Sequence, residues 1–279
     1  DQDGETGQLP VECSTPPERA VLDSACALAV RPDGTAIYSA GPGGIARFCL
    51  PSLELAALAP CPDGVAPHGC VEVAAGDGFL VCADLSGTLF EHDAETCELR
   101  GRAAYRPTVV ERGQRLVGGY MQRFSGAVVG LDCGSALYGG APRLVIGNNT
   151  IYMGGRDGVV TAYAPGALNI LRRARLSDNL RGLQPFGVGF VRWANSGRLY
   201  CGVLSNVHVL TTPSLQTVAT LRGGPRVPVF GNACAAVESG DGRLVFTADI
   251  GGPSVHIWDT ASWHWLARVE LAADGGPAQ

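Results

Sequence analysis

The stretch that decides the fold is residues 254–271, Ser-Val-His-Ile-Trp-Asp-Thr-Ala-Ser-Trp-His-Trp-Leu-Ala-Arg-Val-Glu-Leu. Apolar and polar residues alternate on both sides of a short Thr-Ala-Ser segment, a pattern typical of two antiparallel β-strands joined by a turn. We expect the first strand to end at Trp258-Asp259 and the second to run from Trp263 to Leu271. The stretch therefore predicts a β-hairpin, and other parts of the chain repeat the same unit.

A second pattern recurs upstream of each such hairpin. It consists of Leu or Ile, then Val or Tyr, then any residue, then a small residue, which suits a strand buried on both faces. Most copies follow an Asp-Gly or Ser-Gly hairpin signal, such as Asp33-Gly34 and Asp241-Gly242. Its six copies begin at Ile37, Leu80, Leu116, Ile151, Leu199 and Leu244.

Each copy leads into a third strand, and the ends of these strands give the repeat length. The predicted ends are Leu50, Asp93, Asp132, Ala164, Thr211 and Asp259. Their mean spacing of about 42 residues falls within the period of WD repeats, roughly 40–45 residues. With the Trp258-Asp259 dipeptide, residues 24–271 resemble a divergent WD40-like β-propeller. Residues 154–163, Gly-Gly-Arg-Asp-Gly-Val-Val-Thr-Ala-Tyr, are also similar to repeats of quinoprotein-like propellers.

Both resemblances imply an all-β fold, a single β-propeller built from four-stranded antiparallel blades. The six copies predict six blades; seven blades, or a ring completed by the N-terminal arm or by a partner, are alternatives. We expect a polar arm over residues 1–22, the propeller over residues 23–273 and a flexible tail over residues 274–279.

Composition excludes some functions. All 21 basic residues are Arg, so chemistry that needs a lysine nucleophile or Schiff base is excluded. The net charge of −5 gives no reason to expect a nucleic-acid partner. The longest apolar run, residues 25–30, is far shorter than the ~20 residues that span a bilayer, so we expect no transmembrane segment. An intracellular or organellar soluble compartment is favoured over secretion, because many of the ten cysteines fit core positions of strands.

Enzyme signatures are missing from the sequence. It contains no G-x-S-x-G elbow, no H-E-x-x-H motif and no phosphate-binding loop with its Lys, and the five His show no ligand spacing. We therefore predict no catalytic residue, no metal and no cofactor. These absences favour a protein that is not an enzyme, but the sequence does not decide between an enzyme and a binding protein.

Two groups of residues are candidates for binding another protein. The first group is a series of arginines that extends from the outer strand of the fourth unit into the next loop: Arg172, Arg173, Arg175 and Arg181. Guanidinium groups in this arrangement would bind the carboxylates or phosphates of an acidic partner, or would only protect an exposed strand edge from aggregation. Arg192 and Trp193 form the second group, near the end of a first strand, where they suit either an interface or ordinary packing.

A third group of candidates concerns the central channel. Cys26, Cys70 and Cys234 lie eight residues before a turn glycine, and Tyr105 occupies this position in the third unit. If first strands line the channel, these side chains face it, where thiols would bind a soft metal or form a disulfide. Alternatively, they are small residues required where strands crowd together. Cys61 and Cys70 also flank a loop that a disulfide would close.

Together these features predict a non-catalytic scaffold for protein–protein interaction, working as a subunit of a larger assembly. The alternative is a propeller enzyme or small-ligand binder that uses the central channel, lactonase-like or quinoprotein-like. A secreted sugar-binding propeller is a third interpretation.

Overall fold

The computed structural model describes residues 27–63, 65, 69–104, 142–155, 157–176, 187–203, 205–222, 233–249 and 254–270. These residues form five four-stranded antiparallel sheets, each a simple meander in chain order. None of the described residues forms a helix, so none forms one that could span a membrane. The predicted arm at residues 1–22 and the tail at 274–279 lie outside the described residues.

The five sheets are named here A to E. Sheet A contains β1 Ala27–Val30, β2 Ala36–Gly41, β3 Gly44–Cys49 and β4 Leu55–Ala59. Sheet B contains β5 Cys70–Ala75, β6 Phe79–Asp84, β7 Leu89–Asp93 and β8 Leu99–Ala103. Sheet C contains β9 Arg143–Gly147, β10 Thr150–Gly154, β11 Val159–Tyr163 and β12 Ile170–Arg175. Sheet D contains β13 Phe190–Ala194, β14 Arg198–Val203, β15 Asn206–Thr211 and β16 Thr217–Arg222. Sheet E contains β17 Ala233–Glu238, β18 Leu244–Asp249, β19 Ser254–Asp259 and β20 Trp265–Glu270.

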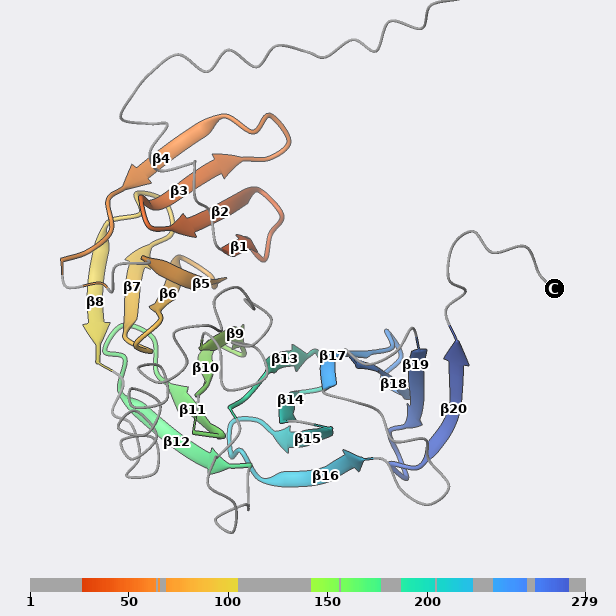
Figure 1. Ribbon diagram of the computed structural model, residues 1–279. Helices are drawn as coiled ribbons and strands as arrows, with labels where there is room; N and C mark the ends of the chain where they lie inside the picture. Colours follow the sequence, from red (N-terminus) through yellow and green to blue (C-terminus); the bar gives the residue numbers. More distant parts are fainter. Residues whose placement is uncertain are drawn as a thin grey trace, which may run out of the picture.

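The sheets are arranged as the blades of a propeller. Their first strands contact one another in series, β1 with β5, β5 with β9, β9 with β13 and β13 with β17. The fourth strands lie on the outside of the arc (Figure 1). The apolar core is therefore a set of layers between neighbouring blades. The second strands β2, β6, β10 and β14 are buried on both faces, whereas buried and half-buried residues alternate along β18.

Second strands confirm the repeat pattern. The copies that begin at Ile37, Leu80, Ile151, Leu199 and Leu244 lie in β2, β6, β10, β14 and β18. Third strands end at Asp93, Thr211 and Asp259 as predicted, whereas β3 ends at Cys49 and β11 at Tyr163, each one residue earlier than expected. The copy at Leu116 and the strand end at Asp132 lie outside the described residues.

The Asp that ends a third strand stabilises the turn that follows. Oδ1 of Asp259 accepts hydrogen bonds from the backbone N–H groups of Ala261 and Ser262, at 2.9 and 2.8 Å. Asp93 accepts equivalent bonds from Glu95 and Thr96. Asp side chains commonly accept a hydrogen bond from the backbone N–H two residues further along the chain. An Asp at the end of the third strand therefore favours the turn that follows it.

Sheets B and C are direct neighbours. Leu89 of β7 packs in one apolar cluster with Ile151 and Met153 of β10, and Glu72 of β5 forms an ion pair with Arg143 of β9 at 2.5 Å. The repeat order predicted a third blade between these two, and the structure brings them into contact instead. The predicted total of six blades, with seven as the alternative, is not decided by the five described sheets.

The two ends of the arc expose apolar side chains. Leu28 and Val30 of β1 are 65% and 57% exposed, and Val237 of β17 is 61% exposed. On the other face of β1, Ala27 and Ala29 pack against the core between sheets A and B. The exposed residues therefore mark a blade face of sheet A, and a blade face of sheet E, that no described residue covers.

Candidate interaction sites

Strand β12 presents arginines on the outer edge of sheet C. Arg172, Arg173 and Arg175 are all exposed, and the outer edge of β12 pairs with no described strand. Arg173 and Arg175 pair with Thr161 and Val159, whereas Arg172 pairs with Ala162. Because successive side chains of a strand point to opposite faces, Arg173 and Arg175 share one face and Arg172 lies on the other. Arg181 lies outside the described residues.

These arginines differ from the charges on the other outer strands. Arg100 of β8 is paired with Asp93, and Arg268 of β20 is paired with Glu270 at 2.6 Å. Within the described part of the chain, no ion pair joins Arg172, Arg173 or Arg175 to an acid. Ile170 and Leu171 beside them are 45% and 48% exposed. The edge therefore combines unneutralised positive charge with exposed apolar surface.

A cavity of about 790 Å³ is lined by residues of sheets D and E, and its lining includes Val237 on the exposed face of sheet E. Arg192 of β13, Tyr200 of β14 and Glu238 of β17 line it, together with the turn that contains Asp241. Glu238 accepts hydrogen bonds from the hydroxyls of Tyr200 and Ser196, and Arg198 lies 3.6 Å from its carboxylate. Burial raises the pKa of the Tyr200 hydroxyl, and the Glu238 carboxylate adds to this effect. The phenol therefore remains a hydrogen-bond donor at neutral pH.

Arg192 and Trp193 do not form one side-chain pair. Arg192 is exposed and lines the cavity toward sheet E, whereas the indole of Trp193 packs with Val145 and Leu199 in the core between sheets C and D. The indole lies directly over Gly147 of β9. Ordinary packing therefore accounts for the Trp193 ring, and Arg192 is the member of the pair that is available to a ligand.

The cysteine candidates for the channel are only partly described. Cys70 is fully buried and packs with Tyr38 and Ile45 between sheets A and B, so its side chain points toward the neighbouring blade. Cys26 and Tyr105 lie outside the described residues, and the structure does not place the side chain of Cys234. Among the described His, Cys, Asp and Glu, no group of three is arranged to hold a metal.

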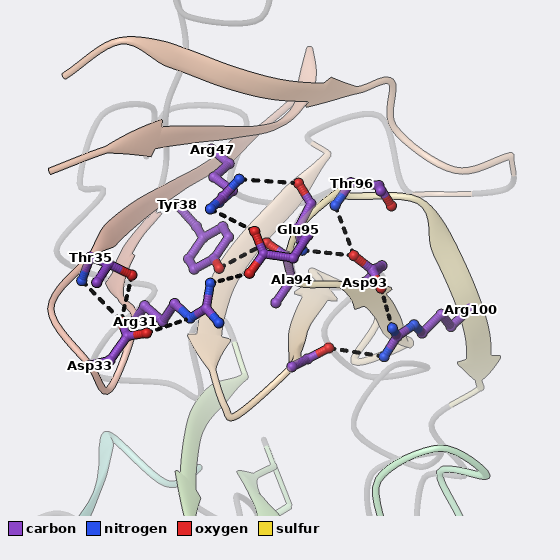
Figure 2. A network of polar contacts seen from close by, with 11 residues as sticks. Arg31, Asp33, Thr35, Tyr38, Arg47, Asp93, Ala94, Glu95, Thr96 and Arg100 are labelled. Atoms are coloured by element: carbon purple, nitrogen blue, oxygen red, sulfur yellow. Dashed lines mark hydrogen bonds and ion pairs between the residues drawn. The ribbon is translucent and has the colours of Figure 1, made fainter. Parts of the chain in front are cut away.

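A polar network that the sequence did not predict joins sheets A and B. Figure 2 shows the carboxylate of Glu95, in the turn after β7, between the guanidinium groups of Arg31 and Arg47 from sheet A. The hydroxyl of Tyr38 donates to the carbonyl oxygen of Ala94 at 2.9 Å, and this bond is buried. The hydrogen bond from Arg31 to Glu95 raises the pKa of that guanidinium. These contacts fix the relative position of two blades.

The radial four-stranded sheets and the Asp-capped turns define the class of protein: the fold is that of a WD40-like β-propeller. The β-propeller domain of Myceliophteria thermophila Cps50 (Swd1) is similar over 88% of this chain and 73% of that chain, with a TM-score of 0.62 and 10% identity. A chain of the Mitotic Checkpoint Complex is similar over 88% of this chain and 66% of that chain, with a TM-score of 0.61 and 13% identity. The computationally designed Ika8 protein is similar over 88% of this chain and 61% of that chain, with a TM-score of 0.59 and 14% identity.

This chain thus spans between 61% and 73% of the length of these structures. No protein-family model and no curated protein matches its sequence. At 10–14% identity the likeness defines the fold, and the function has to be argued from the surfaces described above.

Proposed function

We propose that this protein is a non-catalytic scaffold that binds other proteins and works as a subunit of a larger assembly. The observation that supports it best is the exposed β12 edge, where three arginines lack an acidic partner among the described residues. The similarity to a chain of the Mitotic Checkpoint Complex adds support, since that propeller is part of a protein complex. Rigid blades that present strand edges are well suited to this role.

The partner that fits β12 is an extended acidic segment. The outer edge of β12, which pairs with no described strand, offers backbone N–H and C=O groups to an added strand. Alternate side chains of that strand would meet Arg173 and Arg175 on one face. Guanidinium groups bind carboxylates through paired, charge-assisted hydrogen bonds. Exposed Ile170 and Leu171 would pack against apolar residues of the same segment. Arg181 is part of this proposal as the continuation of the arginine series.

A direct test uses a labelled peptide of alternating Glu and Val, with fluorescence anisotropy as the measurement. We expect the variant Arg173→Glu/Arg175→Glu to bind it at least about tenfold more weakly, because each charge-assisted bond contributes about 1.5–3 kcal/mol. The control variant Arg222→Glu/Arg243→Glu makes the same change of charge at Arg222 in β16 and at Arg243 in the turn before β18. Equal affinity of both variants, or equal binding of a Gln-Val peptide by the native chain, would disprove the acidic-edge proposal.

The assembly role has its own measurement. In native extract, the protein should elute in a complex well above its own 28.9 kDa. The double β12 variant should shift toward the free chain, and elution of the native protein as a free monomer would contradict the scaffold function.

The cavity lined by sheets D and E supports an alternative function, binding of a small ligand. Arg192 and Glu238 supply opposite charges at its wall, and the apolar side chains of Phe246 and Val255 complete it. A ligand that copurifies with the protein and is lost in the Arg192→Ala variant would favour this alternative. Identical mass spectra of small molecules extracted from both proteins would exclude it.

We also retain a six-bladed ring as part of the proposal, with seven blades, or closure by the N-terminal arm or a partner, as alternatives. The uncovered apolar faces of β1 and β17 support at least one further element in the ring. Electron microscopy of the intact protein would count the blades, and a closed ring of five would refute the proposal.

A further inference from the structure

Three cysteines converge at the connection from sheet A to sheet B. Cys61 follows β4, Cys70 begins β5 and Cys82 lies in β6. The thiol of Cys70 lies near enough to those of Cys61 and Cys82 for both to affect its pKa, and Cys70 and Cys82 pack in one apolar cluster. Cys61 also donates to the carbonyl oxygen of Gly41 at 3.2 Å. None of the three is part of a disulfide in the structure.

The backbone around this cluster is tightly fixed. Gly69, which precedes Cys70, has a φ of +68°, and an added Cβ would lie 2.3 Å from Cα of Pro42 and 2.5 Å from the carbonyl oxygen of Gly41. Gly44 of the same β2–β3 hairpin contacts the start of the connector, because an added Cβ would lie 2.1 Å from the carbonyl oxygen of Ala59 and 3.0 Å from Cα of Pro60. The residues next to Cys61 and Cys70 are therefore packed on the β2–β3 hairpin, and both approach the carbonyl oxygen of Gly41, which keeps the two thiols together.

The three thiols differ in access and in acidity. Cys61 is half-buried, whereas Cys70 and Cys82 are fully buried. The hydrogen bond from Cys82 lowers the pKa of the Cys70 thiol, while burial raises the pKa of Cys61 and Cys82. A reagent from solvent therefore meets Cys61 first, and Cys70 is the thiol best prepared to react as a thiolate.

We propose that Cys61 and Cys70 form a reversible thiol–disulfide site that responds to hydroperoxides and locks the seam between sheets A and B. Cys82 is a positioning residue that donates its hydrogen bond to Cys70. The site is independent of the proposed scaffold function, because it lies on sheets A and B and the β12 edge lies on sheet C.

The reaction balances in two steps. A hydroperoxide transfers one oxygen to the Cys61 thiol, which becomes a sulfenic acid, and the reduced product is an alcohol or water. The thiolate of Cys70 then attacks the Cys61 sulfur, the S–S bond forms, and hydroxide leaves and takes up the proton that Cys70 released. Two thiols have supplied two electrons to the O–O bond. A thiol reductant such as glutathione reverses the process by exchange through a mixed disulfide.

The test is peroxide titration of the intact chain, followed by alkylation of free thiols and mass spectrometry of peptides. We expect a Cys61–Cys70 cross-link to appear first, with Cys201 still reduced because burial raises the pKa of its thiol and no neighbouring group lowers it. Dithiothreitol should restore both thiols. Oxidation of other cysteines before this pair, or no cross-link at any peroxide dose that leaves the chain folded, would overturn the proposal.

Variants separate reaction from packing. Cys61→Ser and Cys70→Ser should each abolish the cross-link, whereas Cys82→Ala should retain it and slow its formation by roughly threefold or more, since Cys70 loses the donor that favours its thiolate. Cys201→Ala is the control and should react like the native chain. If a Cys70 variant does not fold, the rate of cross-link formation in Cys82→Ala still tests the proposal. A rate equal to that of the native chain would contradict the role of Cys82. A Cys61–Cys82 cross-link in the native chain would contradict the Cys61–Cys70 pair.

Discussion

Replacing Gly147 by Ala tests the packing of sheet C on sheet D. Gly147 lies in β9 under the indole of Trp193, and an added Cβ would lie 2.2 Å from Cγ, 2.3 Å from Cδ1 and 2.4 Å from Cδ2 of that ring. Carbon atoms pack best at about 3.5–4.0 Å, so the indole would have to move by more than ~1 Å. The ring is packed against Val145 and Leu199 in the same core, which opposes such a movement.

The expected loss of stability combines two effects. Overpacking of a core costs about 1–3 kcal/mol. Loss of glycine freedom in the unfolded chain stabilises by about 0.4–1 kcal/mol. We therefore expect Gly147→Ala to lower the free energy of unfolding by about 1–2 kcal/mol. Urea unfolding followed by tryptophan fluorescence measures it, with an unchanged slope against urea as the sign that the denatured state is not affected.

Gly101→Ala is the matched control, since it places the same methyl group in another strand. The nearest atom to its added Cβ is the carbonyl oxygen of Gly166 at 3.7 Å, an ordinary contact, so this variant should be neutral or slightly more stable. In a Trp193→Ala background the cost of Gly147→Ala should disappear, because the clashing ring is gone. Equal stability of Gly147→Ala and Gly101→Ala would refute the placement of Trp193 on Gly147.

Two further predictions concern the seam between sheets A and B. Burial lowers the pKa of His92, whose Nδ1 lies 2.9 Å from the carbonyl oxygen of Cys97. As the pH falls, the unfolded chain therefore binds a proton at this residue before the folded chain does. The contribution of His92 to the free energy of unfolding is thus fully present above pH 6.5 and is lost as the pH drops below it. His92→Gln should remove this dependence from urea midpoints measured between pH 7 and pH 5, and an unchanged slope would show that another group is responsible. Tyr38→Phe keeps the ring but removes the donor to the Ala94 carbonyl oxygen, so thermal or urea unfolding should show a loss of about 1–3 kcal/mol. A loss below about 0.5 kcal/mol would contradict a buried hydrogen bond at this position.

The strands were predictable because their signals are local. An Asp-Gly turn followed by alternating β-favouring residues defines a strand from about six neighbouring residues, and the copy at Leu244 lies in β18 as expected. The turn that follows the third strand was harder to predict. Leu53, Cys97, Leu168, Leu215 and Trp263 all adopt a positive φ. None of them is Gly, Asn or Asp, the residues that commonly adopt a positive φ, so no preference of the residue itself predicts the conformation.

The side-chain partners were predictable only in part. Strand alternation alone places Arg192 and Trp193 on opposite faces of β13, so the sequence contained the reason that they do not act as a pair. The same rule separates Arg172 from Arg173 and Arg175 on β12. By contrast, the position of Glu95 between Arg31 and Arg47 depends on contacts between residues of sheet A and the turn after β7. Such long-range pairs have no pattern within either segment.

The order of the blades shows where repeat reasoning stops. In a repeat protein each unit is encoded locally, but its stability depends on the interface with its neighbour. The sequence therefore identifies a unit without stating which face of which other unit it packs against. Sheet C meets sheet B through Leu89, Ile151 and the Glu72–Arg143 ion pair, and these complementary faces select the contact regardless of how many residues separate them in the chain. By the same reasoning, the exposed side chains of Leu28, Val30 and Val237 mark the faces at which the ring is closed. Large exposed apolar patches usually mark interaction sites, so we expect a complementary apolar face to cover each of them.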